Sequence, residues 1–315
     1  TEISEILSST FLLNDIKIVL HNASMKIMPN NLIDIKYLLE EYIMKESSYK
    51  KLATQLRENF NSNIVNYDEN VDVLFNKYNN IPLYIVSAGP SLDRNIKDLK
   101  KAKRRGIILS VGRAVKPLLK ENIKPDLIII TDPSPYLYVN QLKGLDLEVP
   151  IIVLSTCDKN VMLKYMGRRL IALQRGYPEA EKYAKEHNHK LVQTGGSVAT
   201  TALDVAINMG CNPIIFVGQD LAYTENRTHS EGAYSRDIAL HNNLREIEDV
   251  YGNIVYTPRN LYSYLRWIQN RIKREKDITF IDATEGGAKI IGTKILTLKE
   301  AIEKYSNKNI MFNIL

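Results

Sequence analysis

Hydrophobic residues in the middle of the chain form short, continuous runs rather than an alternating pattern. Apolar runs of four or five residues are typical of strands that are buried on both faces of a sheet. The runs are Leu83–Val86, Ile107–Val111, Leu127–Ile130, Ile151–Leu154 and Ile214–Val217. We therefore expect these segments to form the centre of a β-sheet.

Amphipathic stretches with helical spacing lie between the apolar runs. They are Leu92–Lys101, Ala114–Glu121, Asp158–Tyr165, Glu179–His187 and Val198–Met209. Strand and helix in alternation favour a parallel sheet, so the predicted fold class is α/β, with a Rossmann-like, mostly parallel sheet flanked by helices. The last stretch is apolar on nearly all sides and stops at Gly210, which predicts a helix buried in the middle of the fold.

The two ends of the chain follow other patterns. Helical spacing in Asn31–Ile43 leads us to predict a small helical N-terminal segment over residues 1–80, and an α/β domain over residues 81–315. After Tyr223 we expect a polar loop, three helices and a short strand. These are Thr224–Tyr234 for the loop, Arg236–Val250, Pro258–Lys273 and Leu298–Tyr305 for the helices, and Thr279–Ile281 for the strand.

Composition narrows the class of protein. The chain has 315 residues, of which 44% are hydrophobic and 25% charged, as in ordinary globular proteins. Its net charge of +6 mildly favours an anionic ligand but is far weaker than the basic stripe of a nucleic-acid-binding protein. We interpret the basic cluster Lys97–Arg105 as the solvated end of a helix.

The sequence also bears on location. Cys157 and Cys211 lack the spacing of metal ligands, which fits a reducing compartment. No apolar run reaches the ~18 residues that a membrane span needs, and Thr1-Glu2-Ile3-Ser4 lacks the layout of a signal peptide. We expect a cytoplasmic protein with no membrane span and no nucleic-acid partner.

Two glycine turns stand where a helix is predicted to begin. One is Gly89-Pro90-Ser91, which follows the run Leu83–Val86, and the other is Thr194-Gly195-Gly196-Ser197, which precedes Val198–Met209. Such turns present backbone N–H groups to an anion, and the helix adds the positive end of its dipole. The first turn is neither a dinucleotide fingerprint nor a Walker loop. For both, the alternative is a helix start without a ligand.

Polar residues at strand ends and in one loop are candidates for chemistry. Asp132 and Gly218-Gln219-Asp220-Leu221-Ala222-Tyr223 each follow an apolar run, at the strand ends where ligands of open α/β sheets bind. The alternative is that both aspartates cap loops. His229, in the polar loop, suits proton transfer near neutral pH, although a loop histidine is often inert. No grouping has zinc-site spacing and no Asp-any-Asp triplet occurs, so we expect no metal.

Several short strings together resemble the motility accessory factor family, bacterial proteins that glycosylate flagellin with nonulosonic acids. They are Ser87–Leu92, Lys124–Asp126, Gly195–Val198, Gly218–Tyr223 with Thr228-His229, and Ala283–Ala288. A fainter likeness extends to bacterial sialyltransferases that use CMP-activated sialic acid. The resemblance implies a GT-A-like sialyltransferase variant of the fold, a CMP-sugar substrate with no cofactor, and a protein acceptor such as flagellin.

The resemblance also implies roles for particular residues. Gly89, Pro90 and Ser91 would approach the nucleotide, while Thr194, Gly195, Gly196 and Ser197 would hold the sugar carboxylate or the phosphate. Asp220 and Tyr223 would line the donor pocket with Gln219, and His229 would be the general base of an inverting, metal-independent transfer. Asp132 stands where the sialyltransferases carry Asn, and Glu285 fits the family pattern without a derived role.

Two other functions stay open at this point. Archaeal pterin diphosphokinases resemble the same central region and would use ATP and magnesium. A non-catalytic module that binds sugar nucleotides or proteins is the second alternative. Family members usually carry extra domains, whereas this chain has only a short helical lead-in, so we expect either a compact member or a fragment. Its acceptor need not be flagellin.

Overall fold

A parallel β-sheet forms the centre of the molecule in the computed structural model, which describes residues 21, 23–24, 27–145, 147–223 and 244–310. Its nine strands stand in the order β1-β6-β5-β4-β3-β2-β7-β10-β11, and every neighbouring pair is parallel. The strands are β1 (Glu69–Asn70), β2 (Leu83–Val86), β3 (Ile107–Val111), β4 (Leu127–Ile130), β5 (Ile151–Leu154), β6 (Arg169–Ala172), β7 (Ile214–Val217), β10 (Phe280–Asp282) and β11 (Lys294–Ile295). The predicted α/β class is confirmed.

The strand order reverses direction beside β2. From β2 the chain proceeds outward through β3, β4, β5 and β6, and then returns to the other side of β2 as β7. Leu83 of β2 accordingly pairs with Ile107 of β3 on one side and with Ile214 of β7 on the other. Loops that leave the sheet on either side of such a reversal diverge, and the crevice between them is where open α/β sheets bind ligands.

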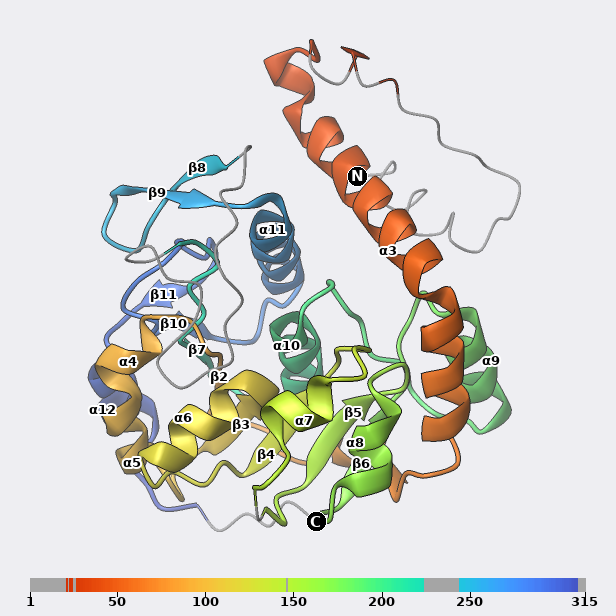
Figure 1. The fold of residues 1–315 in the computed structure, drawn as a ribbon. Helices are drawn as coiled ribbons and strands as arrows, with labels where there is room; N and C mark the ends of the chain where they lie inside the picture. Colours follow the sequence, from red (N-terminus) through yellow and green to blue (C-terminus); the bar gives the residue numbers. More distant parts are fainter. Residues whose placement is uncertain (1–20, 22, 25–26, 146, 224–243, 311–315) are drawn as a thin grey trace.

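Helices cover the sheet, and α10 (Val198–Asn208) lies over its centre. This helix packs against β2, β3, β4 and β7, and residues Ala199–Ala206 are buried, as its all-round apolar pattern predicts. The other helices are α3 (Ile33–Asn63), α4 (Leu92–Asn95), α5 (Leu99–Ala102), α6 (Val115–Lys120), α7 (Leu137–Gln141), α8 (Lys159–Lys164), α9 (Pro178–Glu186), α11 (Arg259–Lys273) and α12 (Leu298–Tyr305), with short 3₁₀ turns η2 (Asn30–Leu32), η3 (Val71–Leu74), η4 (Ile96–Asp98) and η5 (Gly112–Ala114) (Figure 1).

One predicted helix is wrong where the structure describes it. We predicted a helix over Arg236–Val250, but Arg245–Glu248 is a strand, β8, which pairs antiparallel with β9 (Ile254–Thr257). Its half-buried Arg245 and Ile247 alternate with exposed Glu246 and Glu248, which is the period of two that a strand requires. Residues 236–243 lie outside the described part of the chain.

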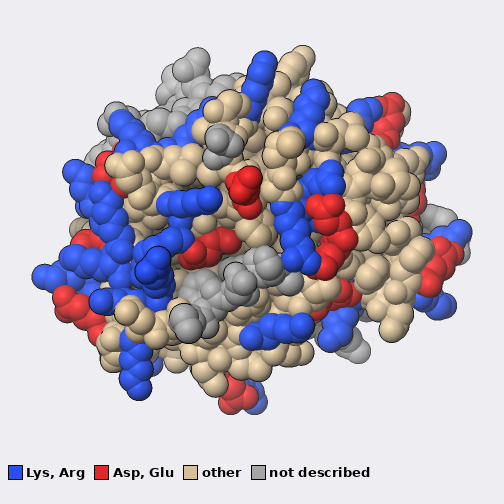
Figure 2. Space-filling view, turned by 90° about the horizontal axis from the view of Figure 1, so that it is seen from below, with Lys and Arg blue, Asp and Glu red and all other residues tan. Residues whose placement is uncertain are grey.

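The basic cluster lies on the face opposite to the carboxyl ends of the strands, where the glycine turns lie. Lys97, Lys100 and Lys101 are exposed, and lysines here pair with acids, as in Lys101–Asp98 at 2.9 Å. Figure 2 shows this face, with Lys and Arg gathered toward one side and acidic side chains among them. The pairing agrees with the interpretation as a solvated helix end. None of the helices in the described ranges combines the length and apolarity needed to cross a membrane.

Candidate functional site

The loops after β2 and β7 meet at the point where the strand order reverses. The N–H of Gly89 donates to the carbonyl oxygen of Gly218 at 2.8 Å. The Asp220 carboxylate accepts the N–H of Ser91 at 3.1 Å and also the Ser91 hydroxyl. These two motifs, whose paired residues Ser91 and Asp220 are 129 positions apart in the sequence, therefore form one unit, as their position at the strand ends predicts.

Glycines in this unit allow backbone to approach backbone. A Cβ atom at Gly89 would lie 2.5 Å from the Gly218 carbonyl oxygen and 2.6 Å from Cγ of Asp220. One at Gly287, whose φ is +70°, would lie 2.6 Å from the Asp220 carbonyl carbon. The N–H of Ala288 donates to the Asp220 carbonyl oxygen at 2.6 Å. The third loop, after β10, is thus locked onto the second.

Gln219 and Glu285 are both engaged within this unit. The Ser87 hydroxyl donates to Gln219 Oε1 at 2.6 Å, and the Gln219 N–H donates to the Thr284 hydroxyl at 3.3 Å. Glu285 Oε1 accepts from the Leu298 N–H and from Asn95 Nδ2, each at 2.9 Å. Glu285 therefore holds the start of α12 beside α4, a role that sequence reasoning did not supply. We call the loops Ser87–Ser91, Gly218–Leu221 and Ala283–Ala288 the switch-point frame.

Backbone strain and one buried carboxyl group are found at the switch-point frame. Leu221 and Glu285 have φ values of +53° and +59°, which non-glycine residues seldom adopt and which often occur at functional sites. Asp282, at the end of β10, is 1% exposed, and its Oδ2 is buried without a hydrogen-bond partner among the described residues. Burial raises the pKa of Asp282 to about 6, and the nearby charge of Asp220 adds to the rise. Sequence analysis did not single out Asp282, although it directly follows the predicted strand Thr279–Ile281, as Asp132 and Asp220 follow theirs.

The second glycine turn begins α10 at the same edge of the sheet. The helix ends just before β7 starts, so it runs opposite to the strands and its N-terminus lies at their carboxyl ends. Ser197 is its N-cap: the Thr200 N–H donates to Ser197 Oγ at 3.3 Å, while the Thr200 hydroxyl donates to the Ser197 carbonyl oxygen at 2.6 Å. The same hydroxyl accepts the Gly195 N–H at 2.9 Å. The turn is thereby fixed with the positive end of the helix facing the edge.

Aromatic side chains of α11 lie against this turn. A Cβ atom at Gly195 would lie 2.5 Å from the Trp267 ring, and one at Gly196 would lie 3.2 Å from the Tyr264 ring. Gly196 itself is exposed and has a φ of +91°. Sequence reasoning missed both aromatics, although Trp267 is the single tryptophan of the chain. Burial raises the pKa of Tyr264, and the charge of Asp132 raises it further.

Asp132 is not part of the switch-point frame, whose loops follow β2, β7 and β10. It follows β4, and its Oδ1 accepts the Ser134 N–H at 2.8 Å, which shapes the loop. We call Thr194-Gly195-Gly196-Ser197 together with Asp132, Tyr264 and Trp267 the α10 turn cluster. Strands lie about 4.8 Å apart, so the ends of β4 and β2 are separated by about 10 Å along the edge. That span suits an elongated ligand better than a compact one.

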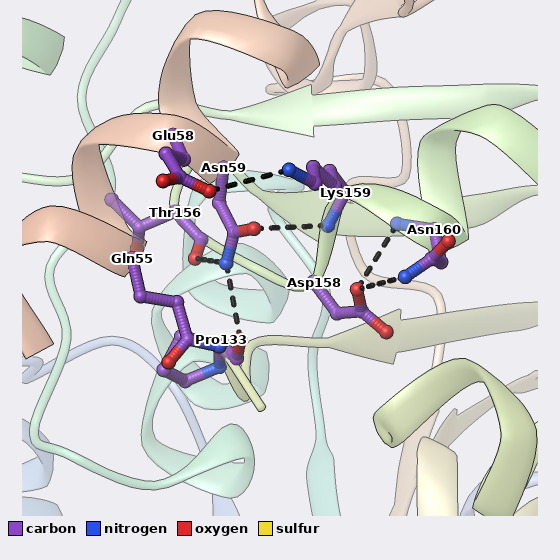
Figure 3. A network of polar contacts seen from close by, with 8 residues as sticks. All are labelled: Gln55, Glu58, Asn59, Pro133, Thr156, Asp158, Lys159 and Asn160. Atoms are coloured by element: carbon purple, nitrogen blue, oxygen red, sulfur yellow. Dashed lines mark hydrogen bonds and ion pairs between the residues drawn. The ribbon is translucent and has the colours of Figure 1, made fainter. Parts of the chain in front are cut away.

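Helix α3 is fastened to the loop that contains Asp132. Asn59 Nδ2 donates to the carbonyl oxygens of Pro133 and Thr156, both at 3.1 Å, and its Oδ1 accepts the Lys159 N–H at 3.3 Å. Figure 3 shows these bonds together with Gln55, which also donates to Pro133, and Asp158, which caps α8. The C-terminal half of α3 thus forms part of the support for the edge.

Tyr223 and His229 are two further site residues that the sequence predicts. Tyr223 is half-buried, its N–H donates to the Tyr256 carbonyl oxygen at 2.9 Å, and burial raises its pKa. His229 lies outside the described residues. Within the described ranges, no three histidine, cysteine or carboxylate side chains are grouped so that they could hold a metal ion. The carboxyl edge of the sheet therefore has three chemical features: the N-terminus of α10, the exposed backbone of Gly196, and the neighbouring carboxyl groups of Asp220 and Asp282.

Comparisons with known proteins bear on this geometry. A family model described as "6-hydroxymethylpterin diphosphokinase MptE-like" matches residues 55–226. A solved structure of the MAf glycosyltransferase from Magnetospirillum magneticum AMB-1 superposes with a TM-score of 0.60 at 18% sequence identity. The match covers 81% of this chain and 42% of that chain, so this chain spans less than half of the solved protein. No curated protein matches the sequence.

The structural match confirms the resemblance to motility accessory factors at the level of the fold. It also extends past the end of the family match, because 81% of the chain exceeds the 172 residues from 55 to 226. The Rossmann-like sheet flanked by helices is therefore shared with a glycosyltransferase, as the sequence predicts.

Proposed function

This chain belongs to the 6-hydroxymethylpterin diphosphokinase MptE-like family, and from its fold and edge geometry we propose that it is a glycosyltransferase. The proposed reaction moves a nonulosonic acid, a sialic-acid-like sugar, from a CMP-activated donor to a Ser or Thr hydroxyl of a protein. Flagellin is the first acceptor to test, because the family that the sequence resembles modifies it.

The observation that carries the proposal is the arrangement of two glycine turns along one edge. The Gly89 turn lies at the reversal of strand order, the position where ligands of open α/β sheets bind. The Gly195-Gly196 turn supplies a helix N-terminus at the same edge, suited to a phosphate or a carboxylate. In a CMP-nonulosonate the phosphate and the carboxylate are both attached at the anomeric carbon, so the Gly195-Gly196 turn could face these anions while the nucleoside extends along the edge over a span of about 10 Å.

In the proposed mechanism, His229 removes the proton of the acceptor hydroxyl as general base. The hydroxyl oxygen then attacks the anomeric carbon, and the bond from that carbon to the phosphate oxygen breaks with inversion. CMP leaves with the electron pair. The amides at the start of α10 and the tyrosine hydroxyls Tyr223 and Tyr264 would stabilise its charge, with no tightly held metal.

The test is an assay of the turnover of a CMP-nonulosonate with a candidate acceptor, in which the release of CMP is measured. We expect His229→Ala to lower the rate by about 100-fold or more, the usual loss on removing a general base. His187→Ala is the matched control, because His187 is exposed at the end of α9 and belongs to none of the motifs. A wild-type rate in His229→Ala would remove the proposed base.

The second candidate function is diphosphate transfer from ATP to a hydroxymethylpterin, as the family description suggests. The observation that favours it is the neighbouring carboxylates Asp220 and Asp282, since Asp282 Oδ2 is buried and lacks a partner within the described residues. Carboxylates of this kind would hold Mg²⁺, which neutralises the phosphates of ATP when it is bound. Formation of AMP from ATP and pterin, with no CMP release from sugar donors, would select this function.

A further inference from the structure

A separate cavity of about 410 Å³ lies between α3, α11 and the start of β8. Among the described residues of its wall, Lys51, Arg245, Arg259 and Arg266 are basic and Glu40 is acidic. The described lining therefore has more basic than acidic side chains. A volume of this size is within the usual range for small-molecule sites, about 300–1,000 Å³.

One guanidinium in the cavity is held rigidly. The Arg245 guanidinium lies 3.9 Å from the centroid of the Tyr37 ring and 4.6 Å from that of Tyr262. These two rings meet edge to face with centroids 5.1 Å apart. Arg245 also pairs with Glu40, which Arg259 approaches at 3.6 Å. Since both arginines share one carboxylate, their charge is only half neutralised.

The positive charge of this cavity differs from that of the basic cluster at Lys97–Arg105. There, Lys100, Lys101 and Lys103 each have an acidic partner of their own, which are Glu121, Asp98 and Asp126. In the described lining of the cavity, Arg245 and Arg259 share the single carboxylate of Glu40, and the basic side chains surround a hollow with aromatic walls. Guanidinium groups present several donors in a planar fork that matches phosphate oxygens.

We propose that this cavity binds a small molecule that carries a phosphate monoester on a sugar. The phosphate would face Arg259 and Lys51, and the sugar would lie against Tyr37 and Tyr262. Helix α11 separates the cavity from the α10 turn cluster, because Tyr264 and Trp267 of the same helix contact that turn. The cavity is therefore a second ligand site beside the donor site, and its existence does not depend on the proposed glycosyl transfer.

Calorimetric titration of the full chain with ribose 5-phosphate tests the proposal, with ribose and inorganic phosphate as comparison ligands. We expect ribose 5-phosphate to bind at least tenfold more tightly than ribose, and more tightly than inorganic phosphate. Arg259→Gln removes a side chain that is 54% exposed, so folding should be unaffected. Loss of one charged hydrogen bond should weaken binding about tenfold or more, and Lys51→Gln should also weaken it.

Lys273→Gln is the matched control, because Lys273 is exposed on the last turn of the same helix and is not part of the cavity wall. It should change affinity less than twofold. Equal binding of ribose and ribose 5-phosphate, or equal weakening in Arg259→Gln and Lys273→Gln, would overturn the proposal. The Tm shift that CMP produces should be the same in Arg259→Gln and the wild type, so failure of this site and failure of the donor site give different results.

Discussion

The switch-point frame and the α10 turn cluster both contain glycines at the carboxyl edge of the sheet, but these glycines serve different ends. In the frame, Gly89 and Gly287 face the protein's own Gly218 and Asp220, and the loops close on one another. In the cluster, Gly196 is exposed, and a Cβ atom added there would come within 4 Å of the Tyr264 ring alone among the described residues, at 3.2 Å. The comparison teaches that a glycine motif can build the wall of a site without touching the ligand, and that the exposed turn is the better candidate for ligand contact.

The largest expected effect is on the stability of the frame. Gly287→Ala would place a methyl group 2.6 Å from the Asp220 carbonyl carbon at a φ of +70°. Left-handed strain of about 1–2 kcal/mol and overpacking of about 1–3 kcal/mol should together lower the free energy of unfolding by about 3 kcal/mol. Urea unfolding measures this. Gly252→Ala is the control, since Gly252 has a φ of +87° with nothing within 4 Å, and it should show the strain alone. Equal losses in both variants would mean that the frame is not closely packed.

A second effect, of similar size, should depend on pH at Asp282. Its pKa is raised from 3.8 to about 6, so the folded protein holds a proton that the unfolded chain releases. The contribution of Asp282 to the free energy of unfolding should therefore fall as pH rises from about 4 to about 6. Above that range this contribution should stay about 3 kcal/mol lower than it is at acid pH. Asp282→Asn removes the titration. Its unfolding free energy relative to wild type should increase between pH 4 and pH 7, and a difference independent of pH would contradict the assignment.

The smallest expected change in stability belongs to the exposed turn. Gly196→Ala would place a Cβ atom 3.2 Å from the edge of the Tyr264 ring at a φ of +91°, and a small shift of that ring would relieve the contact, so the change should cost about 1–2 kcal/mol, the strain alone. Its effect on CMP binding should be disproportionate, about tenfold or more, if donor phosphate or sugar touches this backbone. Calorimetric titration with CMP, compared with Gly252→Ala, separates the two effects. Unchanged CMP affinity would place the ligand elsewhere on the edge.

The central strands could be predicted from the sequence because their burial on both faces leaves a continuous apolar run. The predicted bounds Leu83–Val86, Ile107–Val111 and Ile214–Val217 coincide with β2, β3 and β7. Peripheral strands were missed, since β1 has two residues and β6 starts with the half-buried Arg169. Strand β8 contains one aliphatic residue, Ile247, among three charged ones. Such a segment has no apolar period that distinguishes a strand from a helix, and only the pairing with β9 does so.

The candidate site was only partly accessible to sequence reasoning. Motifs at strand ends could be assigned to one edge, because parallel strands bring their carboxyl ends together. The partners of those motifs could not be assigned. Whether Gly89 admits a ligand or the Asp220 carboxylate depends on a loop that is far away in the sequence, and the same holds for Glu285 and α12. Tyr264 and Trp267 reach the α10 turn from a helix that has no motif of its own.

The attachment of α3 has a consequence for any shortened form of this protein. Side-chain amides of Gln55, Asn59 and Asn63 donate to four main-chain carbonyl groups, which belong to Pro133, Ser155, Thr156 and Cys157. A protein trimmed to begin near residue 81 would lose every one of these donors along with strand β1. Water would then have to solvate the segment that follows Asp132. Such a product should fail first in ligand recognition, even where its central sheet still assembles.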